Sequence, residues 1–250
     1  MIDFGKFPTD QTLLGKVLRF PLKLAPTNIP LPILQGPLRG TKWFVSSGIK
    51  AFWLGSHEAD LQRVMVQTVE PKNVFYDIGA NVGFFTLLGS RLVGPSGRVV
   101  AFEPLPVNLR YIRSHVTFNH LANVQIIEAA VSDDDCVGHF FCADDSDSSI
   151  GRLSDEGIAV RISTIDGLIE GGTIPPPDCI KMDIEGTEAK ALAGAEKCLK
   201  THRPVIFLAT HGQEVHEQCC ELLTSWGFNL QILAAMPNHR WNLLARHFTG

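Results

Sequence analysis

From residue 73 onward, short apolar segments typical of strands alternate with longer segments that have helical periodicity. The first pairs are Asn73–Ile78 with Val82–Val93, and Gly97–Phe102 with Pro106–Asn119; a further strand is expected over Val124–Val131. Strands separated by helices at this spacing favour parallel βαβ units, and continuously apolar strands favour burial on both faces. We therefore expect an α/β fold with a doubly wound, mostly parallel sheet.

The alternation continues after an acidic stretch over residues 132–156. Within that stretch we expect a hairpin at Val137–Cys142, followed by a short strand at Val160–Ser163. Further on, the pattern predicts strands at Cys179–Asp183 and Pro204–Thr210, helices at Glu188–Lys200 and Gln213–Trp226, and a closing strand pair, Asn229–Ala235 and Trp241–Arg246. Residues 71–250 thus form the expected main domain.

The first 70 residues have a different character. Residues 1–40 contain prolines at 8, 21, 26, 30, 32 and 37, a density that argues against long helices and central strands. We expect a proline-rich arm there, which could exchange between subunits of a homo-oligomer. In residues 41–70, Trp43–Ser46 and Lys50–Leu54 predict a hairpin around Ser47–Gly48, followed by a helix over His57–Val69.

Composition narrows the classes of function. The 22 basic and 26 acidic residues give a formal net charge of −4, which disfavours a nucleic-acid-binding surface. No apolar run approaches the roughly 18–20 residues of a membrane span, and the N-terminus lacks the pattern of a signal peptide. The six cysteines form no C-x-x-C pair, so we expect reduced thiols and a cytoplasmic protein.

The most informative motif is Asp77-Ile-Gly79-Ala-Asn81-Val-Gly83, at a junction from strand to helix. Ligands of open α/β sheets bind at the carboxyl ends of strands, where glycine permits a tight turn and close approach of the backbone. A carboxylate at Asp77 would repel the pyrophosphate of a dinucleotide and attract a cationic amine. A nicotinamide-dependent oxidoreductase is therefore the less favoured alternative.

A second acidic residue, Glu103, closes the next strand, 20 residues after Gly83. A carboxylate at that position can accept hydrogen bonds from both hydroxyls of a ribose. Together with Asp77 it indicates a ligand with an adenosine diol and an amino-acid tail. S-adenosyl-L-methionine fits that description.

These residues resemble the FkbM family of S-adenosylmethionine-dependent methyltransferases over about residues 36–212. The supporting segments are Gly55-Ser-His-Glu58, Asp77–Gly83, Phe102-Glu103-Pro104, Ala130-Val-Ser-Asp133, Ser163-Thr-Ile-Asp166 and Ile180-Lys-Met-Asp183-Ile-Glu185-Gly186-Thr-Glu188. The resemblance implies a seven-stranded, Rossmann-like class I fold whose last strand is antiparallel. It also implies methylation, most often O-methylation of a hydroxyl on a sugar, polyketide or related metabolite.

The resemblance also implies a cofactor site. The methionine end would lie against the turn after the first strand, the ribose against Glu103 and its neighbour Pro104, and the adenine against the end of the third strand. The residues expected to bind the cofactor are Asp77, Gly79, Ala80, Asn81, Gly83, Glu103, Pro104, Glu128, Ala130 and Asp183.

Candidates for chemistry lie on the fourth strand and the one after it. Asp183 and Glu185 are two residues apart, so an extended chain would point both to one face, and His211 closes the neighbouring strand. Any of the three could act as general base toward a hydroxyl. We expect Glu58 and Ser149 to contact the acceptor.

Asp183, Glu185, His211, Glu214 and His216 offer oxygen and nitrogen donors that suit several divalent ions. His211-x-x-Glu214-x-His216 lacks the spacing of the zinc-binding histidine pair on a helix, so we expect no metal ion and keep metal dependence as the less favoured alternative. The predicted function is S-adenosylmethionine-dependent O-methylation of a small hydroxylated metabolite, without a nucleic-acid partner. A cofactor-binding regulatory subunit that has lost its chemistry is the alternative from another class, and the intact pair of Asp183 and Glu185 argues against it.

Overall fold

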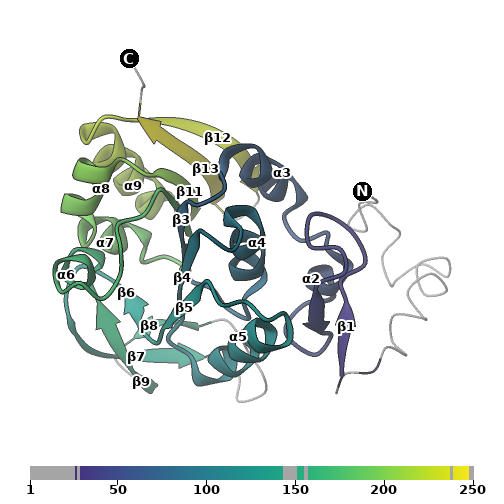
Figure 1. Ribbon diagram of the computed structural model, residues 1–250. Coiled ribbons are helices and arrows are strands. Elements are labelled where there is room, and N and C mark those ends of the chain that lie inside the picture. Colours follow the sequence, from purple (N-terminus) through teal and green to yellow (C-terminus); the bar gives the residue numbers. More distant parts are fainter. Residues whose placement is uncertain (1–25, 27–28, 143–150, 155–156, 237–238, 248–250) are drawn as a thin grey trace.

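The computed structural model describes residue 26 and residues 29–142, 151–154, 157–236 and 239–247. Within these residues, the central element is a seven-stranded sheet in the order β12-β13-β11-β10-β3-β4-β5 (Figure 1). Its strands are β3 (Val74–Ile78), β4 (Arg98–Phe102), β5 (Val124–Ile127), β10 (Cys179–Met182), β11 (Val205–His211), β12 (Phe228–Met236) and β13 (Arg240–His247).

Neighbouring strands from β11 to β5 are parallel, whereas β13 is antiparallel to both β11 and β12. The prediction of a mostly parallel seven-stranded sheet with an antiparallel last strand is confirmed. Chain connections leave β3 and β10 in opposite directions across the sheet, so the carboxyl ends of these two strands mark its switch point. In open α/β sheets, such a point is where ligands bind.

Helices cover both faces of the sheet (Figure 1). On one side lie α3 (Ala59–Thr68), α4 (Phe84–Val93) and α5 (Pro106–Phe118); on the other lie α6 (Ile165–Glu170), α7 (Glu188–Ala193), α8 (Glu196–His202) and α9 (Gln213–Ser225). Successive residues of β3 enter opposite cores, since Phe75 packs with Leu88 of α4 while Tyr76 packs with Leu192 of α7. This alternation is the period of a strand buried on both faces.

The expected long helix over Glu188–Lys200 is divided into α7 and α8. Asp166 explains the break, because its carboxylate accepts hydrogen bonds from the backbone N–H groups of Lys197 and Cys198 and so caps the start of α8. At the end of α7, Gly194 packs so closely on Ser132 that a Cβ atom would lie 2.0 Å from its carbonyl oxygen.

The expected strand Val124–Val131 is also divided. Its first part is β5 of the main sheet, whereas Ala130–Val131 (β6) pairs with β9 (Ile158–Ser163) in a separate four-stranded sheet. The other strands of this small sheet are β7 (Cys136–Cys142) and β8 (Gly151–Ser154). The hairpin expected within Val137–Cys142 is therefore wrong: this segment lies in the single strand β7, which pairs with β8 and β9.

The hairpin predicted around Ser47–Gly48 is wrong. Lys50–Leu54 forms a short helix, α2, and the partner of β2 (Lys42–Phe44) is β1 (Pro30–Pro32). Three consecutive side chains of α2, at positions 52 to 54, are buried. In an exposed two-stranded hairpin, successive side chains would point to opposite faces and could not all be buried. The prolines of β1 are accommodated because this two-stranded sheet is separate from the main sheet.

Residue 40 is therefore not a structural boundary, since β1 and β2 pair across it. Residues 1–25 and 27–28 of the expected arm lie outside the described residues. No helix in the part of the chain that the structure describes is long and apolar enough to cross a bilayer. Cys136, Cys179, Cys198, Cys219 and Cys220 are free thiols, and Cys136 is exposed.

Candidate active site

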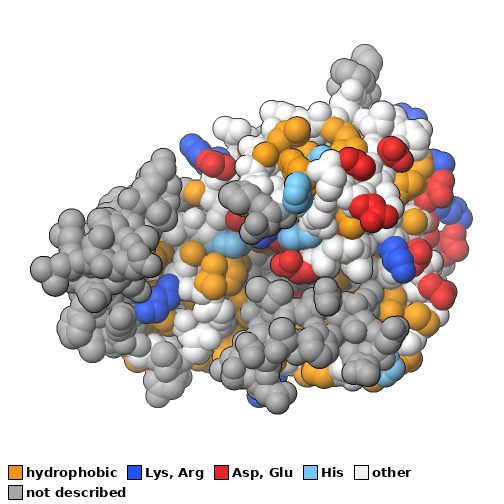
Figure 2. Space-filling view, turned by 180° about the vertical axis from the view of Figure 1, so that it is seen from behind, with side chains coloured by type: hydrophobic (Ala, Val, Ile, Leu, Met, Phe, Trp, Pro, Cys, Tyr) orange, Lys and Arg blue, Asp and Glu red, His pale blue; other side chains and the backbone are white. Residues whose placement is uncertain are grey.

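A cavity of about 260 Å³ opens at the switch point of the sheet. The turn after β3, the segment after β4 and the loop between β10 and α7 form its walls, and side chains of α2 and α4 complete it. Figure 2 shows acidic, basic and histidine side chains lying together in a recess on one face of the molecule. This position agrees with the site predicted from the Asp77–Gly83 motif.

The turn after β3 adopts a conformation that few residues tolerate. Gly79 has a φ angle of +76°, and a Cβ atom on it would lie 2.0 Å from the carbonyl oxygen of Asp183. Asn81 also has a positive φ of +52°, and its backbone N–H donates to Glu103 at 2.8 Å. The turn therefore lies directly against the loop after β10 on one side and against Glu103 on the other.

Glu103 lines the cavity although its side chain is almost completely buried. Besides Asn81, the backbone N–H of Leu105 and the amide of Asn108 donate to its carboxylate, at 2.9 and 3.1 Å. Burial raises the pKa of Glu103 to about 7, against the lowering effect of these hydrogen bonds. The structure thus places Glu103 where a ligand hydroxyl can reach it.

An apolar slot borders Glu103. Its walls include Phe102, Pro104 and the run Ala129–Val131, which contains the predicted residue Ala130. Glu128, by contrast, does not line the cavity: its side chain is 59% exposed and forms an ion pair with Arg113. The structure therefore gives no support to the expected contact between Glu128 and an adenine ring.

Asp77 is buried outside the cavity, contrary to the expected contact with the amine of a ligand. Its Oδ2 accepts a hydrogen bond of 2.6 Å from Thr86, and its Oδ1 lies 3.5 Å from Nζ of Lys181. Lys181 also donates to the carbonyl of Gly79 at 3.1 Å. Burial alone would lower the pKa of Lys181, but nearby carboxylates, Asp77 first among them, raise it.

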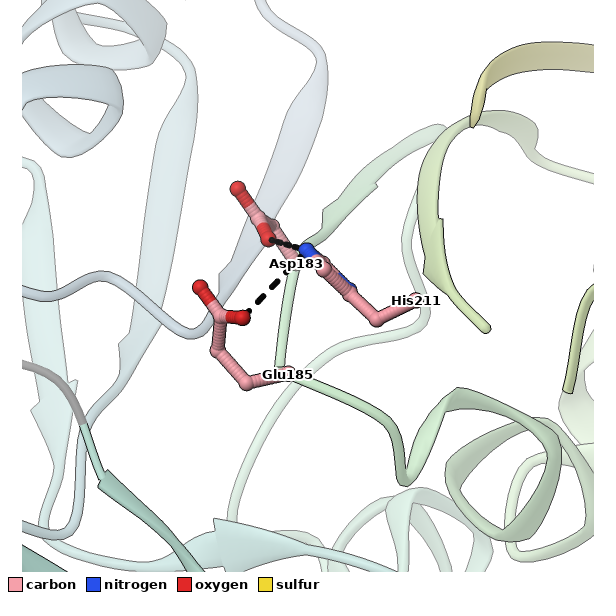
Figure 3. A group of neighbouring side chains, drawn as sticks. All are labelled: Asp183, Glu185 and His211. Atoms are coloured by element: carbon pink, nitrogen blue, oxygen red, sulfur yellow. Dashed lines mark ion pairs between the residues drawn. The ribbon is translucent and has the colours of Figure 1, made fainter. Parts of the chain in front are cut away.

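The three residues predicted for chemistry are brought together beside the cavity, which Asp183 and Glu185 line. Nε2 of His211, from the end of β11, lies 3.5 Å from Oδ1 of Asp183 and 3.4 Å from Oε2 of Glu185 (Figure 3). The strand ends at Met182, and Glu185 reaches this position with a left-handed φ of +56°. The extended geometry expected for Asp183 and Glu185 is therefore wrong, but their proximity is real.

Glu188 orients His211, a role that the sequence did not reveal. The Glu188 side chain is fully buried, and its Oε1 lies 2.7 Å from Nδ1 of His211. Both oxygens of Glu188 also accept from the backbone N–H of Gly186 at 3.1 Å. Burial lowers the pKa of His211, but the hydrogen bond to Glu188 and the nearby carboxylates raise it overall.

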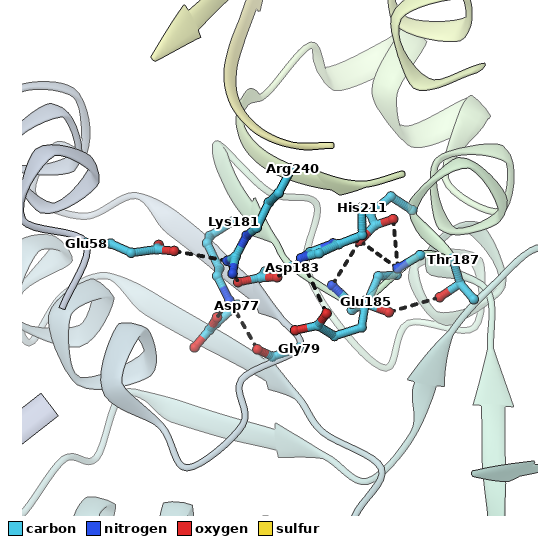
Figure 4. A network of polar contacts seen from close by, with 12 residues as sticks. Glu58, Asp77, Gly79, Lys181, Asp183, Glu185, Thr187, His211 and Arg240 are labelled. Carbon is cyan, nitrogen blue, oxygen red and sulfur yellow. Dashed lines mark hydrogen bonds and ion pairs between the residues drawn. The ribbon is translucent and has the colours of Figure 1, made fainter. Parts of the chain in front are cut away.

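Arg240 is a further site residue that sequence reasoning missed. It lies opposite His211 in the antiparallel pairing of β11 and β13, and no local sequence motif predicts this register. Its Nη2 lies 3.1 Å from Glu58 and 3.3 Å from Asp183 (Figure 4). Burial would raise the pKa of Asp183, but Lys181 and Arg240 lower it overall.

The two residues expected to contact the acceptor have different outcomes. Glu58 and Asp183 both form ion pairs with Arg240. Burial raises the pKa of Glu58, and Glu58 does not line the main cavity. Its neighbour His57 does line the cavity, and burial lowers the pKa of His57 to about 4. Ser149 lies outside the described residues.

Comparison with known proteins finds two curated relatives whose names describe methyltransferases. The hexuronic acid methyltransferase AglP of Haloferax volcanii is 27% identical over 60% of this chain, and the 31-O-demethyl-FK506 methyltransferase FkbM of Streptomyces tacrolimicus is 27% identical over 51%. The matched regions cover 61% of each relative, so the chain spans about three fifths of the length of these curated relatives.

Solved structures share the fold at lower identity. A precorrin-6y C5,15-methyltransferase from Geobacter metallireducens superposes with a TM-score of 0.52 at 18% identity, covering 76% of this chain and 90% of that one. The Streptococcus mutans protein SMU.1697c, solved in complex with SAH, gives a TM-score of 0.51 at 12% identity, covering 75% of this chain and 96% of that one.

The family model described as the methyltransferase FkbM domain matches residues 77–235, which is more than half of the 250 residues. That range begins at the turn after β3 and contains Glu103, Asp183, Glu185, Glu188 and His211. The chain therefore belongs to the family described as the methyltransferase FkbM domain.

Proposed function

We propose that this protein transfers a methyl group from S-adenosyl-L-methionine to a hydroxyl group of a small metabolite. The observation that carries the proposal is that one cavity is lined both by Glu103 with the turn after β3 and by the acidic groups Asp183 and Glu185. A donor and an acceptor can therefore meet inside one cavity, which is what positioning for a displacement requires.

The residues around Glu103 suit the donor. Glu103 offers a carboxylate beside an apolar slot, a combination that fits a ribose diol next to an adenine ring. Asp183 and Glu185 add negative charge to the same cavity, which favours a cationic sulfonium. When bound, the cofactor supplies an electrophilic methyl group.

The residues around His211 suit a hydroxyl acceptor. A hydroxyl is a weak nucleophile at neutral pH, and a neighbouring group that accepts its proton makes it more reactive. Nδ1 of His211 faces the buried Glu188, so Nε2 is the nitrogen directed at Asp183 and Glu185. This cluster can draw the hydroxyl into the cavity and accept its proton.

The names of the two curated relatives support this direction. One is described as acting on a hexuronic acid and the other on 31-O-demethyl-FK506. We therefore propose a sugar, polyketide or related metabolite as the acceptor, and its hydroxyl as the methylated group. The complex of SMU.1697c with SAH supports the choice of cofactor.

Isothermal titration calorimetry with S-adenosylhomocysteine tests the cofactor. We expect the wild-type chain to bind and Glu103→Ala to bind roughly 5–150-fold more weakly, since a lost hydrogen-bond acceptor for a ligand costs about 1–3 kcal/mol. Glu128→Ala is the matched control, because Glu128 follows the next strand but lies outside the cavity. Absence of binding by a folded wild-type chain would overturn the proposal.

Transfer itself is tested with radiolabelled S-adenosylmethionine and a panel of hydroxylated sugars and polyketides. A labelled product whose mass rises by one methyl group and which carries a methyl ether supports O-methylation. Binding without transfer to any acceptor would instead favour a regulatory subunit. Fluorescence titration with reduced nicotinamide nucleotide should show no binding, and saturable binding would favour an oxidoreductase.

A further inference from the structure

Three side-chain atoms of kinds that bind metal ions lie close together in the site. These atoms are Nε2 of His211, Oδ1 of Asp183 and Oε2 of Glu185, and all lie within 4.8 Å of one another (Figure 3). The first two are fully buried and form no hydrogen bond. Groups of this kind are rarely left unsatisfied in a folded protein.

Glu188 fixes which nitrogen of His211 points at the cluster. The carboxylate of Glu188 is buried and already accepts from the N–H of Gly186, so the group it meets on His211 must be the donor, Nδ1–H. In the neutral ring, Nε2 then carries a lone pair. A histidine that donates its other N–H to a carboxylate is the usual arrangement of a metal ligand.

The distances fit a cation better than a shared proton. Nε2 lies 3.5 Å from Asp183 and 3.4 Å from Glu185, beyond the usual 2.7–3.2 Å of such hydrogen bonds. A divalent cation about 2.0–2.3 Å from each ligand would hold those ligands roughly 3.0–3.7 Å apart. Both distances from Nε2 are therefore those expected between ligands of one ion.

Charge leads to the same conclusion. Five carboxylates and two cationic side chains are joined by ion pairs around this point (Figure 4). Their formal charges sum to −3 when His211 is neutral. The carboxylates are Glu58, Asp77, Asp183, Glu185 and Glu188, and the cations are Lys181 and Arg240. A bound divalent cation would offset most of that excess.

We propose that Asp183, Glu185 and His211 bind a divalent metal ion, which the sequence analysis kept only as the less favoured alternative. A mixed set of one imidazole and two carboxylates suits Mn²⁺ or Zn²⁺ better than Mg²⁺. Because Asp183 and Glu185 line the cavity, coordination positions not used by the protein face the space assigned to the acceptor. Glu214 and His216 do not take part: Glu214 is exposed, and His216 stacks on Trp241.

What the ion does rests on the proposed function. A cation beside the acceptor hydroxyl stabilises the negative charge that develops on its oxygen as the proton leaves to solvent, the O–CH₃ bond forms and the S–CH₃ bond breaks. His211 is then a ligand rather than the general base, and Glu188 is a positioning residue.

The test uses Mn²⁺ with the full chain after dialysis against a chelator. Electron paramagnetic resonance measures the unbound Mn²⁺, and its difference from the total should give one bound Mn²⁺ per chain. Pulsed spectra of the bound ion should show coupling to an imidazole nitrogen. Glu185→Gln should weaken Mn²⁺ binding at least tenfold, and His211→Gln should abolish the nitrogen coupling. Glu128→Gln, another exposed carboxylate but outside the cluster, should change neither.

Calorimetry with S-adenosylhomocysteine on the same samples separates the two proposals. If the wild-type chain binds S-adenosylhomocysteine but takes up no Mn²⁺ at 1 mM, the metal site is refuted and the proposed function stands. One bound Mn²⁺ with nitrogen coupling, but no S-adenosylhomocysteine binding, would support the metal site and refute the proposed function. Mn²⁺ binding that survives both ligand substitutions would also refute the assigned site.

Discussion

Lys181 and Asp77 lie opposite each other on the parallel strands β10 and β3, and their side chains form an ion pair with only 5% and 0% of their surfaces exposed. Lys181 also donates to the carbonyl of Gly79. The pair therefore connects the two strands at the point where the cavity begins. The carboxylate that the sequence suggested for the ligand instead stabilises the turn on which the site is built.

Lys181→Met should lower the free energy of unfolding by about 3–5 kcal/mol, because it leaves Asp77 as an uncompensated buried charge. Urea denaturation at pH 7 measures this change. Adding Asp77→Asn to the same chain should recover part of the loss. Lys200→Met, which breaks an exposed pair with Glu196, is the control and should cost less than about 1 kcal/mol. Equal losses in the two lysine variants would contradict a structural role for the buried pair.

Gly79→Ala should damage the site as well as the fold. The added Cβ would lie 2.0 Å from the carbonyl oxygen of Asp183, so the loop that carries Asp183 has to move. We expect a loss of more than about 2 kcal/mol in urea denaturation and a large loss of S-adenosylhomocysteine affinity. Gly172→Ala is a matched control, since Gly172 has a similar φ of +67° but open space around it. If both variants bind S-adenosylhomocysteine equally well, the close approach of Gly79 to Asp183 is not required for binding.

Local patterns were sufficient where structure is set locally. The strands β3, β4, β10 and β11 are mostly apolar and flanked by helical periodicity, and all were predicted. The segment Lys50–Leu54 was misassigned because three successive buried side chains resemble a buried strand, and only contacts with distant residues make them a helix.

The site divides in the same way. Asp183 and His211 could be expected to meet because they end neighbouring parallel strands. The partner of Asp77 could not be predicted, because Lys181 is 104 residues away and opposes it only through strand register. Arg240 enters the site through an antiparallel pairing, and Glu188 looks in sequence like an ordinary acidic residue at a helix start.

His115 gives the fold a predictable dependence on pH. It stacks on Trp43, its Nδ1 lies 2.9 Å from the carbonyl of Val82, and its Nε2 accepts from the N–H of Phe44. Burial lowers the pKa of His115 to about 4, whereas the unfolded chain takes up the proton near 6.5. The unfolded state therefore binds more protons between these values, so this contribution to stability is complete above pH 6.5 and is lost as the pH falls toward 4.

The shift corresponds to about 3 kcal/mol at most. Urea denaturation across pH 4 to 7 should show a shallower slope for His115→Phe than for the wild-type chain. Trp43→Phe is the control: it should lower stability at every pH while the slope remains, because His115 is still present. An unchanged slope in His115→Phe would show that His115 is not the titrating group.

Glu188→Gln should separate positioning from binding. The buried carboxylate accepts the Nδ1–H of His211, and a neutral amide can either donate or accept there, so the tautomer of His211 is no longer fixed. We expect the turnover number for methyl transfer to fall roughly 10–100-fold, while affinity for S-adenosylhomocysteine changes less than about twofold. Nitrogen NMR of the His211 ring should show a mixture of tautomers in the variant and a single Nδ1–H form in the neutral wild-type ring.

Glu196→Gln, at the exposed start of the following helix, is the matched control and should leave both measurements unchanged. A Glu188→Gln chain that keeps full turnover, or that loses only cofactor affinity, would contradict the positioning role.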